Sequence, residues 1–362
     1  MLSVGSLRRQ AVGWSIGAPS RLAEALARVE FVQADPIRAP APAQDLILRH
    51  RVSGYRVGDL DRGYPRLPLD EDVFHVYGFM SRRLRELVQP RLSRRTGRPY
   101  EPEGLASDVL AFVREHGVTH PRQVQAHLGR ATVTNAWGGQ SAATTRALEA
   151  LHYYGLLRVA RREAGIRLYE PAPRWDEPDS AERARARALH MGHLLAPAPE
   201  ASLRAAVNLT HQRPGLSSVV PALLAAGELV AGEVDGVRYV WPATLAPVDA
   251  DPPARVRFLA PFDPVVWDRR RFEHLWGWAY RFEAYTPVAK RKLGYYAMPL
   301  LWRDRVIGWA NCSRDAGGVR VELGFVDGRP RQKRFDAALE AEVARLTAFL
   351  TPARRVIVAP PE

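Results

Sequence analysis

One order of elements, several helices followed by a β-hairpin, recurs along this sequence and constrains its fold more than any other feature. In the clearest copy, SDVLAFVREHG has the pattern of an amphipathic helix that ends at Gly117 and turns Val109, Phe112 and Val113 inward. The residues THP open a second short helix, and SAATTRALEALHYYG forms a third. LLRVARREAGIRLYE then gives two strands joined at EAG. Three helices and a hairpin make the winged-helix plan, in which the third helix enters the major groove of DNA.

A further copy follows the proline-rich, acidic linker PAPRWDEPDS. Here the pattern predicts helices near Ala181–Leu194, Ser202–Val207 and Leu216–Ala226. ELVAGEVDGVRYVWP then alternates apolar and polar residues on both sides of Asp235-Gly236, a strong signal for a two-residue hairpin turn.

The start of the chain follows the same order of elements less completely. Helices are predicted over Ser3–Trp14 and Pro19–Val29, and a strand comes directly after them. We therefore predict winged-helix-like units over residues 1–100, 101–175 and 176–250.

Residues 251–362 have a different character. They are rich in aromatic and β-branched residues with turn signals between them, which favours a small, mainly antiparallel β domain. KRFDAALEAEVARLTAFL closes it as an amphipathic helix whose inward residues are Phe335, Leu339, Val343, Leu346 and Phe349. The predicted fold class is α+β, with tandem winged-helix units followed by this β domain.

The charge of the chain points to a polyanionic partner. The formal net charge is +13 and the pI about 10.3, so nucleic acid is the first candidate. Only Lys290, Lys292 and Lys333 are lysines; codon usage explains a preference for arginine, but not the excess of positive over negative charge. The single cysteine, Cys312, excludes an internal disulfide and a cysteine-based zinc site, and indicates a reducing, cytoplasmic compartment. Without a run of about 18 apolar residues or a signal peptide, we expect no membrane association.

The stretch FVQADPIRAP places two polar side chains at the end of a short apolar run. Alternation along a strand would put Gln33 and Asp35 on one face and Ala34 on the other. Pro36 cannot donate to a sheet, so the strand is expected to end there with its carboxylate at a rim. The alternative is structural, because Asp-Pro commonly opens a turn.

Several chemistries lack their motif in this sequence. His116 and His120 are four residues apart and His190 and His193 three apart, but no H-E-x-x-H pattern or cysteine accompanies them, so we expect no metal site. The glycines do not have the spacing of a phosphate-binding loop or a dinucleotide fingerprint. No cofactor is implied.

Basic and aromatic residues are interspersed in WDRRRFEHLWGWAYRFEAYTPVAKRKLGYY. Arg269 and Arg270, and further on Lys290, Arg291 and Lys292, are suited to gripping phosphates beside aromatic rings that stack on bases. The alternative is that the aromatic residues form core and the arginines a solvated edge; these aromatic residues are Phe262, Trp267, Phe272, Trp276 and Trp278.

The third helix of the clearest winged-helix unit offers little for reading bases. Its only arginine is Arg146, beside the polar residues Thr144, Thr145 and His152. Arg146 is its candidate DNA contact.

Two long segments resemble the AlkZ/YcaQ-like family of bacterial DNA glycosylases, which are built on tandem winged helices. They are FVQADPIRAPAPAQDLILRHRV and LAPFDPVVWDRRRFEHLWGWAYRFEAYTPVAKRKLGYYAMPLLWRDRVIGW, and the resemblance spans nearly the whole chain. Gln33-Ala-Asp35 is similar to the Gln-x-Asp branch of the family. Two features depart from the family pattern: the small Ala34 between the two polar residues, and the arrangement of His75 and Tyr77 in DVFHVYGFMSRR.

The resemblance implies release of N7-alkylguanine and N3-alkyladenine from double-stranded DNA and unhooking of interstrand crosslinks, in a monofunctional enzyme of base excision repair. Asp35 would stabilise positive charge on the sugar and take a proton from water that Gln33 orients. We expect a monomer in the bacterial cytoplasm, associated with the nucleoid. The main alternative is a non-enzymatic winged-helix transcriptional regulator, and a weaker one is an RNA-binding factor.

Overall fold

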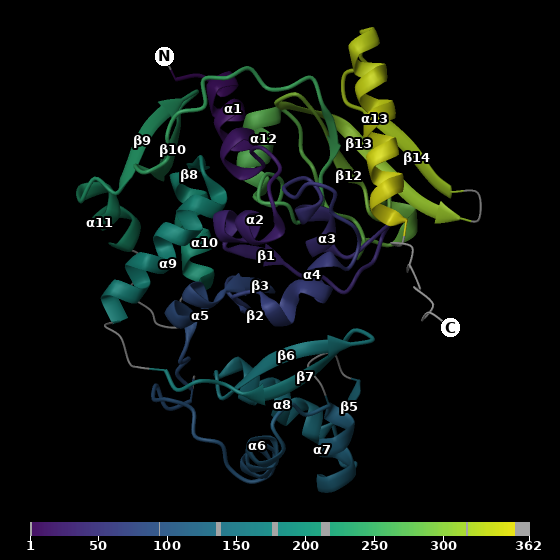
Figure 1. Cartoon of the computed structure of the whole chain (residues 1–362). Coiled ribbons are helices and arrows are strands. Elements are labelled where there is room, and N and C mark those ends of the chain that lie inside the picture. Colours follow the sequence, from purple (N-terminus) through teal and green to yellow (C-terminus); the bar gives the residue numbers. More distant parts are fainter. Residues whose placement is uncertain are drawn as a thin grey trace, which may run out of the picture.

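The protein has an α+β fold of many helices and small antiparallel sheets, as the sequence predicts (Figure 1). The computed structural model describes residues 2–93, 95–134, 139–175, 180–210, 218–315 and 318–351. In Figure 1 the second predicted unit lies below the rest of the chain, and the C-terminal helix lies against the C-terminal sheet. Among these residues no helix has the length and apolar character needed to cross a membrane.

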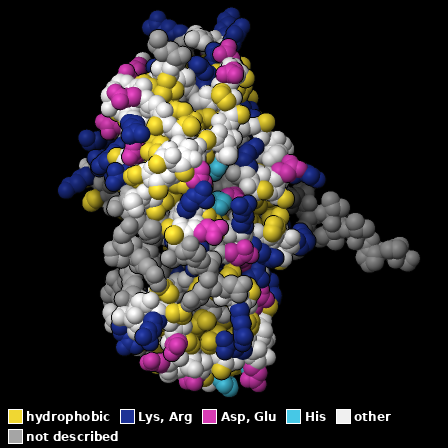
Figure 2. Space-filling view, turned by 90° about the vertical axis from the view of Figure 1, so that its left-hand side faces the viewer, with side chains coloured by type: hydrophobic (Ala, Val, Ile, Leu, Met, Phe, Trp, Pro, Cys, Tyr) yellow, Lys and Arg dark blue, Asp and Glu magenta, His cyan; other side chains and the backbone are white. Residues whose placement is uncertain are grey.

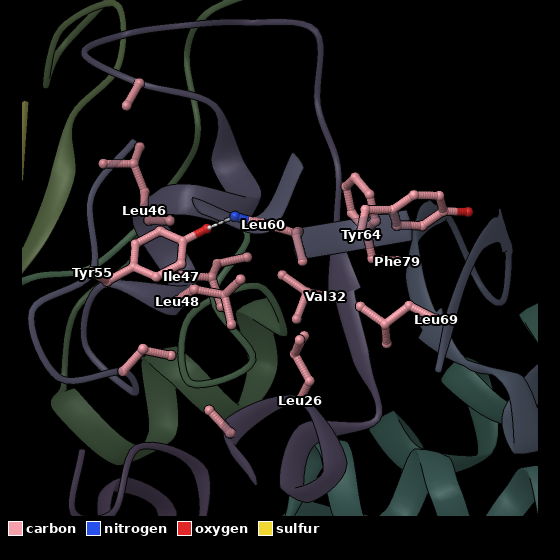
Figure 3. Packing of buried hydrophobic residues seen from close by; sticks show 14 of the residues in the cluster. Leu26, Val32, Leu46, Ile47, Leu48, Tyr55, Leu60, Tyr64, Leu69 and Phe79 are labelled. Atoms are coloured by element: carbon pink, nitrogen blue, oxygen red, sulfur yellow. Dashed lines mark hydrogen bonds between the residues drawn. The ribbon is translucent and has the colours of Figure 1, made fainter. Parts of the chain in front are cut away.

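The N-terminal region is built around a three-stranded antiparallel sheet in the order β1-β3-β2. Val32 of β1 packs with Leu26, Leu46 and Phe79 in the core shown in Figure 3. The elements of this region are α1 (Val4–Ser15), α2 (Leu22–Val29), β1 (Phe31–Gln33), α3 (Ala43–Leu48), α4 (Asp59–Gly63), a 3-10 turn (Tyr64–Arg66), β2 (Leu69–Val73), β3 (Tyr77–Ser81) and α5 (Arg82–Val88).

The second region contains the predicted three helices and hairpin. Val109, Phe112 and Val113 are buried, as expected from the helical pattern. Its elements are α6 (Leu105–His116), α7 (Pro121–Leu128), β4 (Thr132–Thr134), β5 (Gln140–Ala142), α8 (Ala143–Tyr153), β6 (Leu157–Glu163) and β7 (Ile166–Pro171). The β4–β5 pair lies between the second and third predicted helices and was not predicted; β4 has no buried residue, so it lacks the alternation that marks a strand.

The third region repeats this order of helices and hairpin. It consists of α9 (Ser180–Leu195), β8 (Ala198–Pro199), α10 (Glu200–Thr210), α11 (Val219–Ala225), β9 (Leu229–Val234) and β10 (Val237–Pro242). The hairpin turns at Asp235 and Gly236, whose φ angles of 52° and 73° match the predicted turn. Linker residues 176–179 and residues 216–217 of the third predicted helix lie outside the described residues.

The C-terminal region is a four-stranded antiparallel sheet, β11-β12-β13-β14, with two helices. Its elements are β11 (Val256–Phe258), α12 (Arg269–Trp276), β12 (Met298–Trp302), β13 (Arg305–Asp315), β14 (Gly318–Phe325) and α13 (Lys333–Leu350). Four of the five residues predicted to face inward on α13 are buried, and Val343 packs partly buried against the same core. The helix α12 was not predicted: Asp268 caps its first turn, and Phe272, Leu275 and Trp276 form one apolar face.

Packing crosses the boundaries between these regions. Leu7, Ala11 and Val12 of α1 lie in one core cluster with Tyr239 of β10 and Phe272 of α12. The first helix thus packs on the third and C-terminal regions, while α2, α3 and part of the sheet belong to a core cluster that extends into the second and C-terminal regions.

A buried ion pair joins the N-terminal and C-terminal regions. The two terminal nitrogens of Arg51 donate to the two carboxylate oxygens of Asp263 at 2.7 and 2.9 Å, and both side chains are fully buried. Asp263 also accepts the N–H of Val265 at 3.0 Å, and Arg51 donates to the Ser15 side chain at 2.9 Å. Every strong acceptor and donor at this contact has a partner, so it holds the two regions in one orientation.

Candidate active site

The Gln-x-Asp motif stands where β1 ends. Gln33 pairs with Gly78 of β3, and the N–H of Ala34 still donates to the Tyr77 carbonyl at 3.0 Å. Asp35 lies beyond this pairing, and its Oδ1 accepts the N–H of Ile37 at 2.8 Å. Asp35 is therefore in a turn that follows the strand, and not on the strand face that we predicted for it together with Gln33.

Both polar side chains of the motif are half-buried and incompletely paired. Among the described residues, Gln33 makes no side-chain hydrogen bond, and Asp35 uses only one of its two oxygens. Burial raises the pKa of Asp35 above its ordinary value, although the N–H of Ile37 partly opposes this. A carboxylate with a raised pKa and an unused oxygen is equipped to accept a proton.

Two tyrosines of the C-terminal region lie close enough to Asp35 for their ionisation to respond to it. Burial raises the pKa of Tyr285 and of Tyr296, and the negative charge of Asp35 raises both further. Tyr296 is only 4% exposed, and its hydroxyl has no hydrogen-bond partner among the described residues. Tyr285 is 76% exposed. The fold thus brings residues some 250 positions apart in the sequence together at one site.

The segment that carries these tyrosines is firmly held. Phe282 packs its ring edge-on against both Tyr285 and Tyr296. The buried carboxylate of Glu283 accepts the backbone N–H groups of Lys292 and Leu293, each at 2.8 Å. A buried carboxylate that accepts several backbone N–H groups restrains the loop between them.

The predicted phosphate-binding residues of this segment differ in their contacts. Arg291 donates from its Nε to the Thr286 carbonyl at 2.8 Å and lies over the Tyr295 ring at 5.1 Å, so it stabilises the loop. Lys290 and Lys292 are exposed, and their ammonium groups have no ion pair with the described residues. Of the three, the two lysines are the ones placed to contact phosphate.

The remaining predicted DNA contacts lie on other elements. Arg269 and Arg270 are exposed at the start of α12, whereas Arg271 is fully buried and donates to backbone carbonyls. Arg146 of α8 is exposed and pairs with Glu149 at 3.0 Å. On the face in Figure 2, Lys and Arg side chains are interspersed with acidic and hydrophobic ones, so the net charge is not gathered into one patch there.

His75 occupies an aromatic pocket on the side of β1 where alternation places Gln33. Its ring stacks on Trp267 at a centroid distance of 5.0 Å and also contacts Phe31, which precedes Gln33 by two residues. Burial lowers the pKa of His75 to about 4, so the imidazole is neutral at pH 7. Its Nδ1 has no hydrogen-bond partner among the described residues.

Within the described ranges, no group of three or more histidine, cysteine, aspartate or glutamate side chains could hold a metal ion. Asp263, the acidic residue in LAPFDPVVW, forms an ion pair with Arg51 and therefore has a structural role. Sequence reasoning missed that role, because nothing within one sequence links positions so far apart.

The architecture is similar to that of a solved DNA glycosylase. The structure of Streptomyces sahachiroi DNA glycosylase AlkZ superimposes with a TM-score of 0.64 over 96% of this chain and 96% of that one, at 14% sequence identity. At this identity the match establishes a shared fold.

The sequence itself identifies the family. The model of the AlkZ-like DNA glycosylases matches residues 26–349, which is most of the chain and includes both Gln33-Ala-Asp35 and the tyrosine-bearing segment. The chain belongs to this family of DNA glycosylases. It is therefore an enzyme that acts on DNA, and the regulator alternative loses its support.

Proposed function

We propose that this DNA glycosylase hydrolyses the N-glycosidic bond of N7-alkylguanine and N3-alkyladenine in duplex DNA, with Asp35 and Gln33 as its catalytic residues. The observation that carries the proposal is the half-buried, singly bonded carboxylate of Asp35 beside the exposed Tyr285. The enzyme would act as a monomer in the cytoplasm, without a cofactor.

The chemistry needs no general acid. Alkylation at N7 or N3 makes the purine a cation, so the base can leave with the electron pair of the breaking bond. Positive charge then develops on the sugar, and an ionised Asp35 stabilises it. Water attacks the anomeric carbon and gives a proton to the carboxylate, while the amide of Gln33 orients the water.

The hydroxyl of Tyr296 is placed to support this step. A buried hydroxyl without a partner is costly in a folded protein, and such groups are characteristic of functional sites. When DNA is bound, the hydroxyl can donate a hydrogen bond to Asp35 or to the attacking water. Tyr296 would then be a positioning residue that keeps the carboxylate in its ionised form.

The surroundings of Asp35 also suit a crosslinked substrate. A base tethered to the opposite strand cannot be drawn into a closed pocket, so unhooking requires an open site. Pro36, which follows Asp35 in the chain, and Tyr285, whose pKa responds to Asp35, are both exposed, and exposed Lys290 and Lys292 follow Tyr285 closely in the chain. We therefore include interstrand crosslinks of alkylated purines among the proposed substrates.

The test is single-turnover base release from a duplex with one N7-methylguanine, comparing the wild-type protein with Asp35→Asn at saturating enzyme. We expect release by the wild type and a rate lower by about two to four decades in the variant, the range for a group that transfers protons. A duplex crosslinked through N7 of guanine, assayed in parallel, tests unhooking. Tight DNA binding with no release from either substrate would refute the proposed substrates, and equal rates for both proteins would refute the role of Asp35.

A further inference from the structure

A cleft of about 360 Å³ opens between the end of α3 and the helix α13. Arginines dominate its lining: Arg49 and Arg56 come from the N-terminal region, Arg255 precedes β11, and Arg345 belongs to α13. Among the described residues, the only carboxylate in the lining is that of Glu342. None of the residues of the candidate active site takes part.

Glu342 is already fully used by its neighbours. One carboxylate oxygen accepts from Arg49 at 2.5 Å and from the Phe258 N–H at 3.1 Å. The other accepts from Nε and a terminal nitrogen of Arg345 at 3.1 and 2.9 Å. One negative charge therefore serves two arginines and has no free lone pair directed at the rest of the cleft.

Two other cations of the cleft, Arg56 and Arg255, have no ion pair with the described residues. The side chain of Arg56 donates to the backbone carbonyls of Ala348 and Thr351, at 3.2 Å each. Among the described residues, Arg255 has no ion pair, and its buried Nε has no hydrogen-bond partner. The Nε of Arg49 is also buried without a partner, in a side chain only 3% exposed.

Burial and mutual repulsion make this close packing of arginines costly. Burial and the charge of Arg345 lower the pKa of Arg255, and burial and the charge of Arg255 lower that of the neighbouring Arg257 to about 10. Cations packed this closely are stabilised when an anion is placed among their unused N–H donors.

We propose that this cleft is a binding site for a phosphate group, either a phosphodiester of the DNA backbone or a free phosphate. Guanidinium groups direct several N–H donors in one plane, and they match phosphate oxygens better than any other side chain. The guanidinium groups of Arg255 and Arg56, which hold no ion pair with the described residues, would be its ligands. The proposal is independent of the chemistry at Asp35.

The first arm of the test uses inorganic phosphate alone. Titration of the wild-type protein followed by calorimetry, against chloride at matched ionic strength, is expected to show saturable binding. Arg255→Gln removes a donor and a charge that hold no ion pair, and should weaken phosphate binding about tenfold or more, the effect of one lost hydrogen bond to a charged group. Arg331→Gln removes an exposed charge outside the cleft and should leave phosphate binding unchanged.

The second arm uses undamaged duplex DNA and the dependence of its affinity on salt. If the ligand is a backbone phosphate, Arg255→Gln should reduce the slope of log K against log salt by about 0.9, the value for one lost phosphate contact. Arg331→Gln is the reference for loss of a distant charge. Asp35→Asn should bind phosphate as the wild type does, which separates this site from catalysis.

Either positive arm supports the site and identifies the source of the phosphate. If neither phosphate binding nor the salt slope differs between Arg255→Gln and Arg331→Gln, the proposal is overturned. Circular dichroism and thermal unfolding establish that the variants are folded. Should Arg255→Gln not fold, Arg56→Gln is compared in the same two arms, because Arg56 holds only backbone carbonyls at the exposed end of α13.

Discussion

The segment from Phe31 to Val52 has polar residues at both ends, and the two ends differ in how completely these are paired. At one end, Gln33 makes no side-chain hydrogen bond with the described residues, and Asp35 uses one oxygen. At the other, Arg51 and Asp263 satisfy each other with two hydrogen bonds and gain further bonds from their surroundings.

The difference separates residues that build the protein from residues that are free to act. A buried polar group whose partners are all protein groups has no capacity left for a substrate. A half-buried carboxylate with an unused oxygen can still bind a substrate or accept a proton, and its incomplete pairing lowers the stability of the fold. We expect substitutions at the two ends of the segment to divide in the same way between stability and activity.

The largest expected effect on stability is that of Asp263→Asn. The change removes the charge that balances Arg51 in a fully buried pair, and leaves a buried guanidinium without its counterion. The free energy of unfolding should fall by about 3–5 kcal/mol, measured by urea denaturation.

The matched control for this change is Asp336→Asn. Asp336 pairs with Arg329 at 2.7 Å, but both side chains are about half exposed. Its loss should cost no more than about 1 kcal/mol. If both variants lose the same stability, burial of the Arg51–Asp263 pair has no special importance, and the contrast between the two ends of the segment fails.

A smaller effect, on activity alone, is expected for Tyr296→Phe. The hydroxyl has no partner among the described residues, so its removal should leave the free energy of unfolding unchanged or slightly raised. Base release from N7-methylguanine should slow about tenfold, since one hydrogen bond to a charged group is lost in the reacting complex.

Tyr280→Phe is the opposite case and serves as the control. The hydroxyl of Tyr280 is buried and donates to the Ala297 carbonyl at 2.8 Å. Its removal should cost about 1 kcal/mol of stability and leave base release unchanged. Normal base release by Tyr296→Phe would show that this hydroxyl plays no part in the reaction.

Much of the fold could be predicted from local patterns. Helices with an apolar face and a glycine stop, and the hairpin at Asp235-Gly236, follow from short-range chemistry and are present in the structure. The β4–β5 pair and the helix α12 could not, since β4 buries nothing and the arginines of α12 are followed by Phe272 and Trp276, aromatic residues that favour strands.

The candidate active site could be predicted only in part, because some of its contacts join segments that are distant in the sequence. Gln33 and Asp35 stood out because two polar residues break an apolar run. That Tyr296 lies near Asp35, and that Asp263 pairs with Arg51, depends on how segments more than 200 residues apart pack together, and no local pattern records such a contact.

The exposed cations that could contact DNA differ in whether they already hold an ion pair. Lys290→Gln combined with Lys292→Gln removes two exposed charges that hold no ion pair with the described residues. The slope of log K against log salt for duplex binding should fall by about 0.9 for each lysine that contacts phosphate. Arg146→Gln should change it less, because Arg146 already pairs with Glu149. A larger change for Arg146 would place the main DNA contact on α8.

The smallest expected effect concerns Asp35 and the stability of the fold. We expect its half-buried carboxylate to lower the free energy of unfolding slightly. Because burial raises the pKa of Asp35, the folded protein binds its proton more tightly than the unfolded chain does, and ionisation of this group destabilises the fold. Asp35→Asn should therefore be slightly more stable than the wild type at pH 7. The difference should vanish as the pH falls below the ordinary pKa of aspartate, about 3.9, where both states of the wild type are protonated. A variant less stable than the wild type at pH 7 would mean that Asp35 holds the turn together. The polar residues at both ends of the segment Phe31–Val52 would then be structural.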